Sequence, residues 1–191
     1  MVSRDGKQAL SPCLVRTGAT QAGYGVIAPA DQVPRNRGAA DDDGIYITDT
    51  TTGKSRLLVS IREIVETAVP KFNLDDYAGG DFYGFHVKWN PQDDRIMFVL
   101  RWVSHTAGLK YGPDLITMRA DGSEICRPIQ NDVWSKGGHH PDWCPDGETV
   151  MMNLRLHDAG LSLIRARYDG SGFEELTTVH GSGHPTLHPN G

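Results

Sequence analysis

Apolar residues occur along the chain in short runs that polar turns separate. The stretches 44–59, 114–129 and 161–176 each hold a β-rich run, a turn built on glycine, and a second run in which apolar and polar side chains alternate. Alternation with a period of two predicts half-buried β-strands, and Gly or Asp-Gly supplies the positive φ angles of tight hairpin turns. The pattern therefore predicts an all-β chain made of successive hairpins.

A second pattern, the motif H-x-x-[WL]-x-P, precedes or follows these hairpins. It occurs at 86–91, 140–145 and 184–189, and its first two copies continue through a polar turn into an apolar run. One such copy and one hairpin make a unit of four strands, and the copies recur at intervals close to the roughly 40–50 residues of a propeller blade. Residues 3–10 look like the tail of an earlier copy. The repeat therefore indicates a β-propeller.

We predict an all-β, partial β-propeller of about three to four four-stranded blades in a single domain. Because the same turn stands near both ends, as Asp5-Gly6 and as Asn190-Gly191, we expect part of a larger propeller rather than a closed ring. The expected segments are blade 1 at about 1–59, a connecting helix at about 60–69, blade 2 at about 84–131, blade 3 at about 138–178 and the start of the next blade at 184–191.

Two segments interrupt the repeat. Residues 16–43 are rich in Gly, Pro and charged residues, which predicts a long excursion between the second and third strands of blade 1. In the segment 60–69, Ser60 and Glu63 have the spacing of a capping box ahead of apolar residues at helical positions. This segment is therefore expected to form a short helix.

Composition limits the classes of function. A hydrophobic content of 38%, a formal net charge of −5 and no long apolar span argue against a protein embedded in a membrane. No basic stripe is present, which argues against a nucleic-acid partner. Cys13, Cys126 and Cys144 have no C-x-x-C spacing, so neither a disulfide framework nor a cysteine zinc site is indicated. The first residues lack the apolar core of a signal peptide.

The three motif histidines, His86, His140 and His184, are the candidate site residues. In an up-and-down blade the chain reverses at each turn, and the innermost strand lines the central channel. If each histidine begins an innermost strand, the three imidazoles ring the channel at one end. A structural role is the alternative, because histidines in blades also hydrogen-bond to neighbouring strands.

Arginines and loops are expected at the same end of the channel. Arg101 and Arg155 occupy equivalent positions relative to the tryptophans of their repeats, and the loops 16–43 and 101–113 follow second strands. Histidines beside arginines suit an anionic ligand, held directly or through a metal. Five large side chains are predicted to lie in the core: Trp89, Trp143, Met97, Met151 and Met152. Three further histidines are predicted to be solvated: His105, His157 and His180.

The segments "HVKWNPQDDRIMF", "DLITMRADGSEICRPI", "HHPDWCPDGETVMM" and "LSLIRARYDGSGFEEL" resemble TolB-type propeller repeats over about residues 84–191. In the order of its His-containing blades the chain is also similar to the oligogalacturonate lyases. That family consists of seven-bladed propellers that cleave pectic oligosaccharides by β-elimination and hold a divalent metal, typically manganese. The resemblance implies that this chain is a segment of such a propeller and that its ligand is an anionic oligosaccharide.

The lyase resemblance also implies roles for single residues. It makes His140 a metal ligand and His86 a catalytic base, with Arg101 stabilising the charge that develops on the substrate carboxylate. Arg155 and His184 would contact substrate. The family's further metal ligands, in a Q-x-x-H-P-H-P stretch, have no counterpart in this sequence, so the segment alone is expected to be a poor enzyme.

Two other classes of function stay open. One is a non-catalytic propeller that binds a protein or a sugar on its face. The other is the propeller domain of a larger hydrolase, although no G-x-S-x-G nucleophile motif occurs in these residues.

Overall fold

The computed structural model describes residues 1–106, 112–177 and 182–188. Within them the strands form three antiparallel sheets. The first sheet contains β1 (Gln8–Ser11), β2 (Gly44–Asp49) and β3 (Ser55–Ser60); the second contains β4 (Gly80–Trp89), β5 (Arg95–Ser104), β6 (Gly112–Arg119) and β7 (Cys126–Ile129); the third contains β8 (Gly138–Trp143), β9 (Thr149–His157), β10 (Gly160–Arg167) and β11 (Glu174–Thr177).

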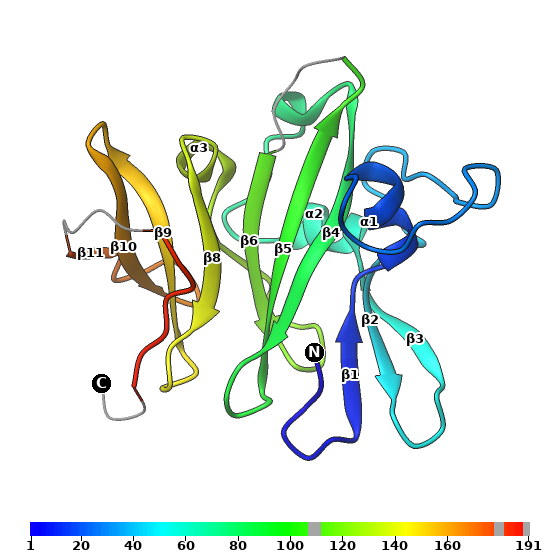
Figure 1. Cartoon of the computed structure of the whole chain (residues 1–191), viewed down its shortest axis with the longest axis horizontal. Coiled ribbons are helices and arrows are strands. Elements are labelled where there is room, and N and C mark those ends of the chain that lie inside the picture. The colour runs from blue at the N-terminus through cyan, green and yellow to red at the C-terminus, as the bar shows by residue number, and fades with distance from the viewer. Residues whose placement is uncertain (107–111, 178–181, 189–191) are drawn as a thin grey trace.

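The three sheets stand side by side in a row, in the order of the chain (Figure 1). In each sheet, strands that follow one another in the sequence are hydrogen-bonded neighbours, so every sheet is an up-and-down meander. This is the predicted arrangement of propeller blades, and the sheets are called blades 1, 2 and 3 below. Blade 1 has three strands, and its β1 takes the place of a second strand, as residues 3–10 predicted.

Apolar side chains fill the two spaces between the blades. Blades 1 and 2 meet through one cluster, formed chiefly by Leu10, Ile45, Ile47, Val59, Phe82, Trp89, Phe98, Leu100 and Ile116. Blades 2 and 3 meet through another, formed chiefly by Met97, Val99, Leu115, Trp143, Val150, Met152, Leu154 and Ile164. The tryptophans and methionines that were predicted as core residues are all buried.

Helix α2 (Ile61–Thr67) connects blade 1 to the segment before β4, as predicted. Ser60 caps its first turn: the Ser60 hydroxyl accepts a hydrogen bond from the backbone N–H of Glu63 at 3.0 Å. The helix buries Ile61 and Ile64 against the core between blades 1 and 2, so packing stabilises this short helix in addition to its cap. No helix in the described residues is long and apolar enough to span a membrane.

Three helical elements were not predicted: α1 (Leu14–Thr20), the 3₁₀-helix η1 (Leu74–Tyr77) and α3 (Asn131–Trp134). Helix α1 contains a glycine and is short, so its sequence gives little helical signal. Its stability comes from tertiary contacts: Arg16 hydrogen-bonds to Asp42, and the Thr17 hydroxyl donates to the carbonyl of Gly84 at 2.8 Å. The two contacts therefore fasten α1 to the end of the excursion and to blade 2.

Two predicted boundaries are wrong. Strand β4 begins at Gly80 rather than near residue 84, so His86 lies well inside the innermost strand and not at its start. Strand β5 continues to Ser104, which shortens the predicted loop 101–113. The reason is that the β4–β5 ladder extends past the apolar run, through pairs such as Tyr83 with Arg101, to the pair of Gly80 with Ser104.

The first and last described segments belong to opposite ends of the row. Strand β1 pairs with β2, whereas residues 182–188, in which no strand is assigned, lie beside blade 3. The Asn153 side chain of β9 donates a hydrogen bond to the carbonyl of Gly183 at 2.8 Å. The described residues thus give an open row of blades, as predicted; the expected Asn190-Gly191 turn lies outside them.

Candidate functional site

The three motif histidines come together where blades 2 and 3 meet. The rings of His140 and His184 stack with their centroids 3.7 Å apart and their planes tilted by 33°. His86, on the neighbouring blade, is close enough to both for their charges to act on it. The structure therefore brings side chains from three separate copies of the motif into one cluster, which is called the histidine cluster below.

An irregular backbone places His140 in this cluster. Gly137, Gly138 and His140 all have positive φ angles, of 130°, 154° and 58°. The register of the β8–β9 ladder shifts between His139 and Asp142, so β8 carries a bulge there. A bulge re-aims a side chain relative to the regular strand. Two adjacent histidines can therefore stand at the start of a strand whose later residues, such as Trp143, are buried.

His86 is the member of the cluster whose protonation is most strongly perturbed. The surrounding protein removes water from its ring, although one side still reaches solvent, and the positive charges of Arg101 and Lys88 act in the same direction. Together these effects lower the pKa of His86 from 6.5 to about 4. The imidazole is therefore neutral at neutral pH. Loss of water and neighbouring histidines likewise lower the pKa of His140.

Arg101 is fixed beside His86 by two contacts. Its guanidinium lies 3.6 Å from the centroid of the Phe85 ring, and its Nη1 donates a hydrogen bond to Gln21 Oε1. The Tyr83 hydroxyl donates to the same Gln21 oxygen at 3.0 Å. Among the described residues, Nη2 of Arg101 makes no hydrogen bond, so this group can still receive a ligand oxygen.

Arg155 does not join the histidine cluster. Its side chain is exposed on β9 and lies over Gly137, and its backbone N–H donates to the Gly137 carbonyl at 2.8 Å. It is not among the groups that perturb His86 or His140. Positions that are equivalent in the repeat are therefore not equivalent in the site, although β4 and β8 both carry a register shift beside their motif histidine.

Lys88 is a further positive charge beside the histidine cluster. Lys88 spans the two inner strands: its Nζ donates to the Pro141 carbonyl at 3.0 Å and lies 3.1 Å from Asp142 Oδ1. His105 and His157 are exposed, as predicted, and pair with Asp81 and Glu175. His180 lies outside the described residues.

The described residues do not supply a metal site. Across residues 1–106, 112–177 and 182–188, no group of three or more His, Cys, Asp or Glu side chains is arranged to hold a metal ion. A metal role for His140, with manganese as the ion, therefore stays a prediction. The His, Cys, Asp and Glu side chains of the described residues do not by themselves fit it.

Exposed apolar side chains lie in and after α1, and one of them, Tyr24, contacts the Phe85 ring on which Arg101 lies. After α1 the chain turns back, so that Val26 N–H donates to the Leu14 carbonyl at 2.9 Å. The Tyr24 ring packs edge-on against Phe85 with 4.8 Å between centroids. Tyr24, Val26 and Ile27 are 50%, 47% and 99% exposed. Side chains Leu14, Tyr24, Val26 and Ile27 are called the apolar patch below. Figure 1 shows α1 and this loop at the end of the blades where strand β4 begins. This is the position that was predicted for residues 16–43.

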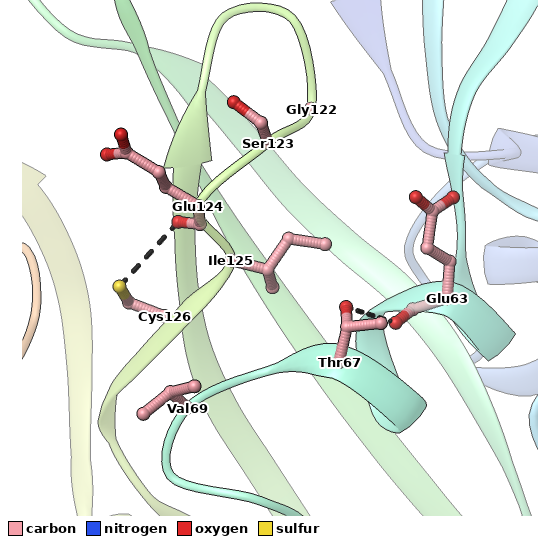
Figure 2. A pocket seen from close by; sticks show the side chains of 8 residues that line it. All are labelled: Glu63, Thr67, Val69, Gly122, Ser123, Glu124, Ile125 and Cys126. Atoms are coloured by element: carbon pink, nitrogen blue, oxygen red, sulfur yellow. Dashed lines mark hydrogen bonds between the residues drawn. The ribbon is translucent and has the colours of Figure 1, made fainter.

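A separate hollow lies between α2 and the β6–β7 turn (Figure 2). Its volume is about 360 Å³, and Glu63, Val69, Ile125 and Cys126 contribute to its lining. The Cys126 thiol donates to the Glu124 carbonyl at 3.6 Å, and loss of water raises the pKa of this thiol. A protonated thiol is a weak nucleophile. We therefore assign no nucleophilic role to Cys126 in this hollow.

No protein-family model matches the sequence, and no curated protein matches it. Among solved structures, the chain is similar to a protein from Agrobacterium tumefaciens described by the name TolB, with a TM-score of 0.53, 20% identity and coverage of 100% of this chain and 50% of that one. It is also similar to TolB from Acinetobacter baumannii, with a TM-score of 0.42, 15% identity and coverage of 80% and 31%. The chain thus spans half the length of the first of these structures.

The likeness to the Agrobacterium structure concerns the fold. Together with the three meander sheets it supports an all-β, partial propeller of TolB-like type. The oligogalacturonate lyase part of the resemblance stays a prediction. Gln21, Tyr83 and Tyr24 are site residues that the repeat did not reveal, because they come from the excursion or from an extension of β4.

Replacing Arg101 by glutamine is expected to raise the pKa of His86 from about 4 toward its ordinary value of 6.5. Removing a nearby positive charge favours the protonated imidazole. Histidine side-chain NMR over a pH titration measures this shift. Arg155→Gln is the matched control, since it removes the equivalent arginine of the next blade and should leave the titration of His86 unchanged. An unaltered His86 pKa in Arg101→Gln would show that the two side chains are not neighbours.

Proposed function

We propose that this chain is the binding part of a non-catalytic, TolB-like propeller, and that it receives an acidic segment of a protein partner at its His-bearing end. The observation that carries the proposal is the apolar patch beside Arg101 and the histidine cluster. An exposed apolar patch next to cationic side chains is typical of a protein-binding surface. A carboxylate-bearing segment with some apolar side chains would satisfy both parts.

The charged groups support an acidic ligand. Arg101 offers Nη2, and its guanidinium is held in position by Phe85 and Gln21. A pre-positioned guanidinium pairs well with a carboxylate, because less side-chain freedom is lost on binding. His86 is neutral at neutral pH, so it contributes a hydrogen bond to such a ligand and no charge.

The apolar patch favours a protein over an oligosaccharide. Ile27 is 99% exposed and Val26 is 47% exposed. Aliphatic side chains gain by burying apolar area, which a peptide with Leu or Phe side chains offers and a uronate oligosaccharide offers less. The anionic oligosaccharide is therefore the second ligand to be tested.

Lyase activity is the second candidate function, and a single feature favours it. Elimination from a uronate needs a base that is unprotonated near neutral pH and a cation on the substrate carboxylate. His86 beside Arg101 supplies these two groups. No step through a metal is assigned, since the described residues do not form a ligand set.

We expect Arg101→Gln to weaken binding of a fluorescent peptide of alternating Glu and Leu by about tenfold or more, because a charge-assisted hydrogen bond is lost. Fluorescence anisotropy measures the affinity. Arg155→Gln is again the matched control and should bind as the wild type does.

Two outcomes would contradict the proposal. One is an affinity that Arg101→Gln leaves unchanged. The other is binding of an oligogalacturonate, but not of the peptide, by the wild type; formation of unsaturated product from it, detected by ultraviolet absorbance, would favour the lyase.

A further inference from the structure

A polar hollow of about 310 Å³ lies between blade 2 and the excursion that contains α1. It is lined by the end of α1, residues 35 and 36 of the excursion, the beginning of β4 and the end of β5. Its volume is in the range of small-molecule sites, at the lower end of about 300–1,000 Å³. The histidine cluster and the apolar patch contribute none of its lining residues.

The negative charge in this hollow is already used by the protein. Asp81 Oδ1 accepts a hydrogen bond from the backbone N–H of Gly38 at 2.7 Å, and Asp81 Oδ2 lies 2.8 Å from His105 Nε2. Asp81 thus fastens the excursion to β4 and holds His105 at the rim. With both oxygens engaged, Asp81 does not make the hollow a cation site.

The positive charge, in contrast, is unused. Arg35 lines the hollow, and within the described ranges its guanidinium makes no hydrogen bond or ion pair. Its neighbour Asn36 is buried and fully bonded: Oδ1 accepts from Arg16 at 2.7 Å, and Nδ2 donates to Asp43 and to the Phe82 carbonyl. These bonds fix the backbone beside Arg35, whereas the Arg35 side chain itself is exposed and can turn toward a ligand.

Hydroxyl groups complete the lining. The Ser104 hydroxyl accepts from the backbone N–H of Thr106 at 3.1 Å and keeps its own proton for a ligand. The Thr20 hydroxyl donates to the Arg16 carbonyl at 2.7 Å and keeps its lone pairs as acceptors. The hollow therefore presents one free guanidinium, one available donor and one available acceptor.

We propose that this hollow is a binding site for a small, hydroxylated monocarboxylate. Arg35 pairs with the carboxylate, and Ser104 and Thr20 hydrogen-bond to hydroxyls of the ligand. A phosphate dianion fits less well, since the lining has a single free cation and the Asp81 carboxylate stands nearby. This site is distinct from the protein-binding surface proposed above and does not depend on it.

A ligand in this position bridges the excursion and blade 2. Arg35 belongs to the excursion, whereas Ser104 ends β5 and His105 directly follows it. A ligand that binds only the folded chain raises its apparent stability by RT ln(1 + [L]/Kd), where [L] is the ligand concentration. The melting temperature of the chain is therefore expected to rise with the concentration of the ligand.

Gluconate and sorbitol test the proposal, because they share a hydroxylated six-carbon chain and only gluconate has a carboxylate. Backbone amide NMR of the wild type should show saturable shifts with gluconate at Asp81, Phe82, Val103 and Ser104, and none with sorbitol. Arg35→Gln should reduce gluconate affinity at least tenfold. Arg37→Gln, an exposed arginine two residues further on and outside the hollow, is the matched control and should bind normally.

Further measurements separate this site from the proposed function. Arg35→Gln should bind the Glu-Leu peptide as the wild type does, whereas Arg101→Gln should bind it about tenfold more weakly or worse. Ser104→Ala serves as a second variant if Arg35→Gln fails to fold, and it should also weaken gluconate binding. Equal shifts with sorbitol, equal gluconate affinity in the Arg35 or Ser104 variants, or tighter binding of inorganic phosphate than of gluconate would overturn the proposal.

Discussion

Asp114→Ala is expected to lower the free energy of unfolding by about 3–5 kcal/mol, because it leaves a buried guanidinium without its counter-ion. Asp114 is 0% exposed, and its Oδ1 lies 2.7 Å from Nε of Arg127, whose side chain is 6% exposed. The same carboxylate accepts from the Tyr77 hydroxyl at 3.1 Å and from the Asn131 N–H at 2.9 Å. Losing it therefore releases both η1 and the start of α3 from blade 2.

Urea unfolding followed by circular dichroism measures this loss. Glu148→Ala is the matched control, since it removes the carboxylate of an exposed pair, with Glu148 Oε2 2.8 Å from Arg167 Nη2, and should cost less than about 1 kcal/mol. Replacing Asp114 and Arg127 together by apolar residues should recover part of the stability, because no buried charge is then left unpaired. A loss no larger for Asp114→Ala than for Glu148→Ala would contradict the structure of blade 2.

Phe98→Ala is expected to cost about 3–5 kcal/mol of stability, because a large ring is removed from a filled core. Phe98 is 0% exposed on β5 and belongs to the cluster that joins blades 1 and 2. Its ring also packs on the backbone of Gly84, where a Cβ atom would stand only 2.7 Å from it. Without the ring, an unfilled cavity would remain in the core between blade 1 and strands β4 and β5.

The matched control is Phe173→Ala. Phe173 is 44% exposed, so the same chemical change at this position should alter the free energy of unfolding by no more than about 0.5 kcal/mol. Urea unfolding of the two variants gives the comparison. Similar losses for both would mean that the space between blades 1 and 2 is not a packed core.

The blades could be predicted because their signals are local. Period-two alternation and glycine turns determine each hairpin, and the recurrence of H-x-x-[WL]-x-P orders the hairpins into units. Helix α2 was predictable for the same reason, since the Ser60 cap and the apolar face of the helix lie within a few residues. Helix α1 was not, because Arg16 depends on Asp42 and Thr17 depends on Gly84, which are distant in sequence.

The site was predictable in part. The motif correctly indicated that His86, His140 and His184 lie together, because equivalent positions of neighbouring blades meet along the inner strands. The same reasoning placed Arg155 with Arg101, yet Arg155 stands apart, with its side chain over Gly137. Gln21 could not be predicted, because its role comes from the path of the excursion over β4 and β5.

The convergence of the motif histidines is the central claim, and nuclear Overhauser contacts between histidine rings test it most directly. In a sample with labelled histidine side chains, the rings of His140 and His184 should show a strong mutual contact, since their centroids lie 3.7 Å apart. A His184→Gln variant should lose this signal and so assign it. Absence of any contact between these rings in the folded wild type would contradict the assembly of the site from successive blades.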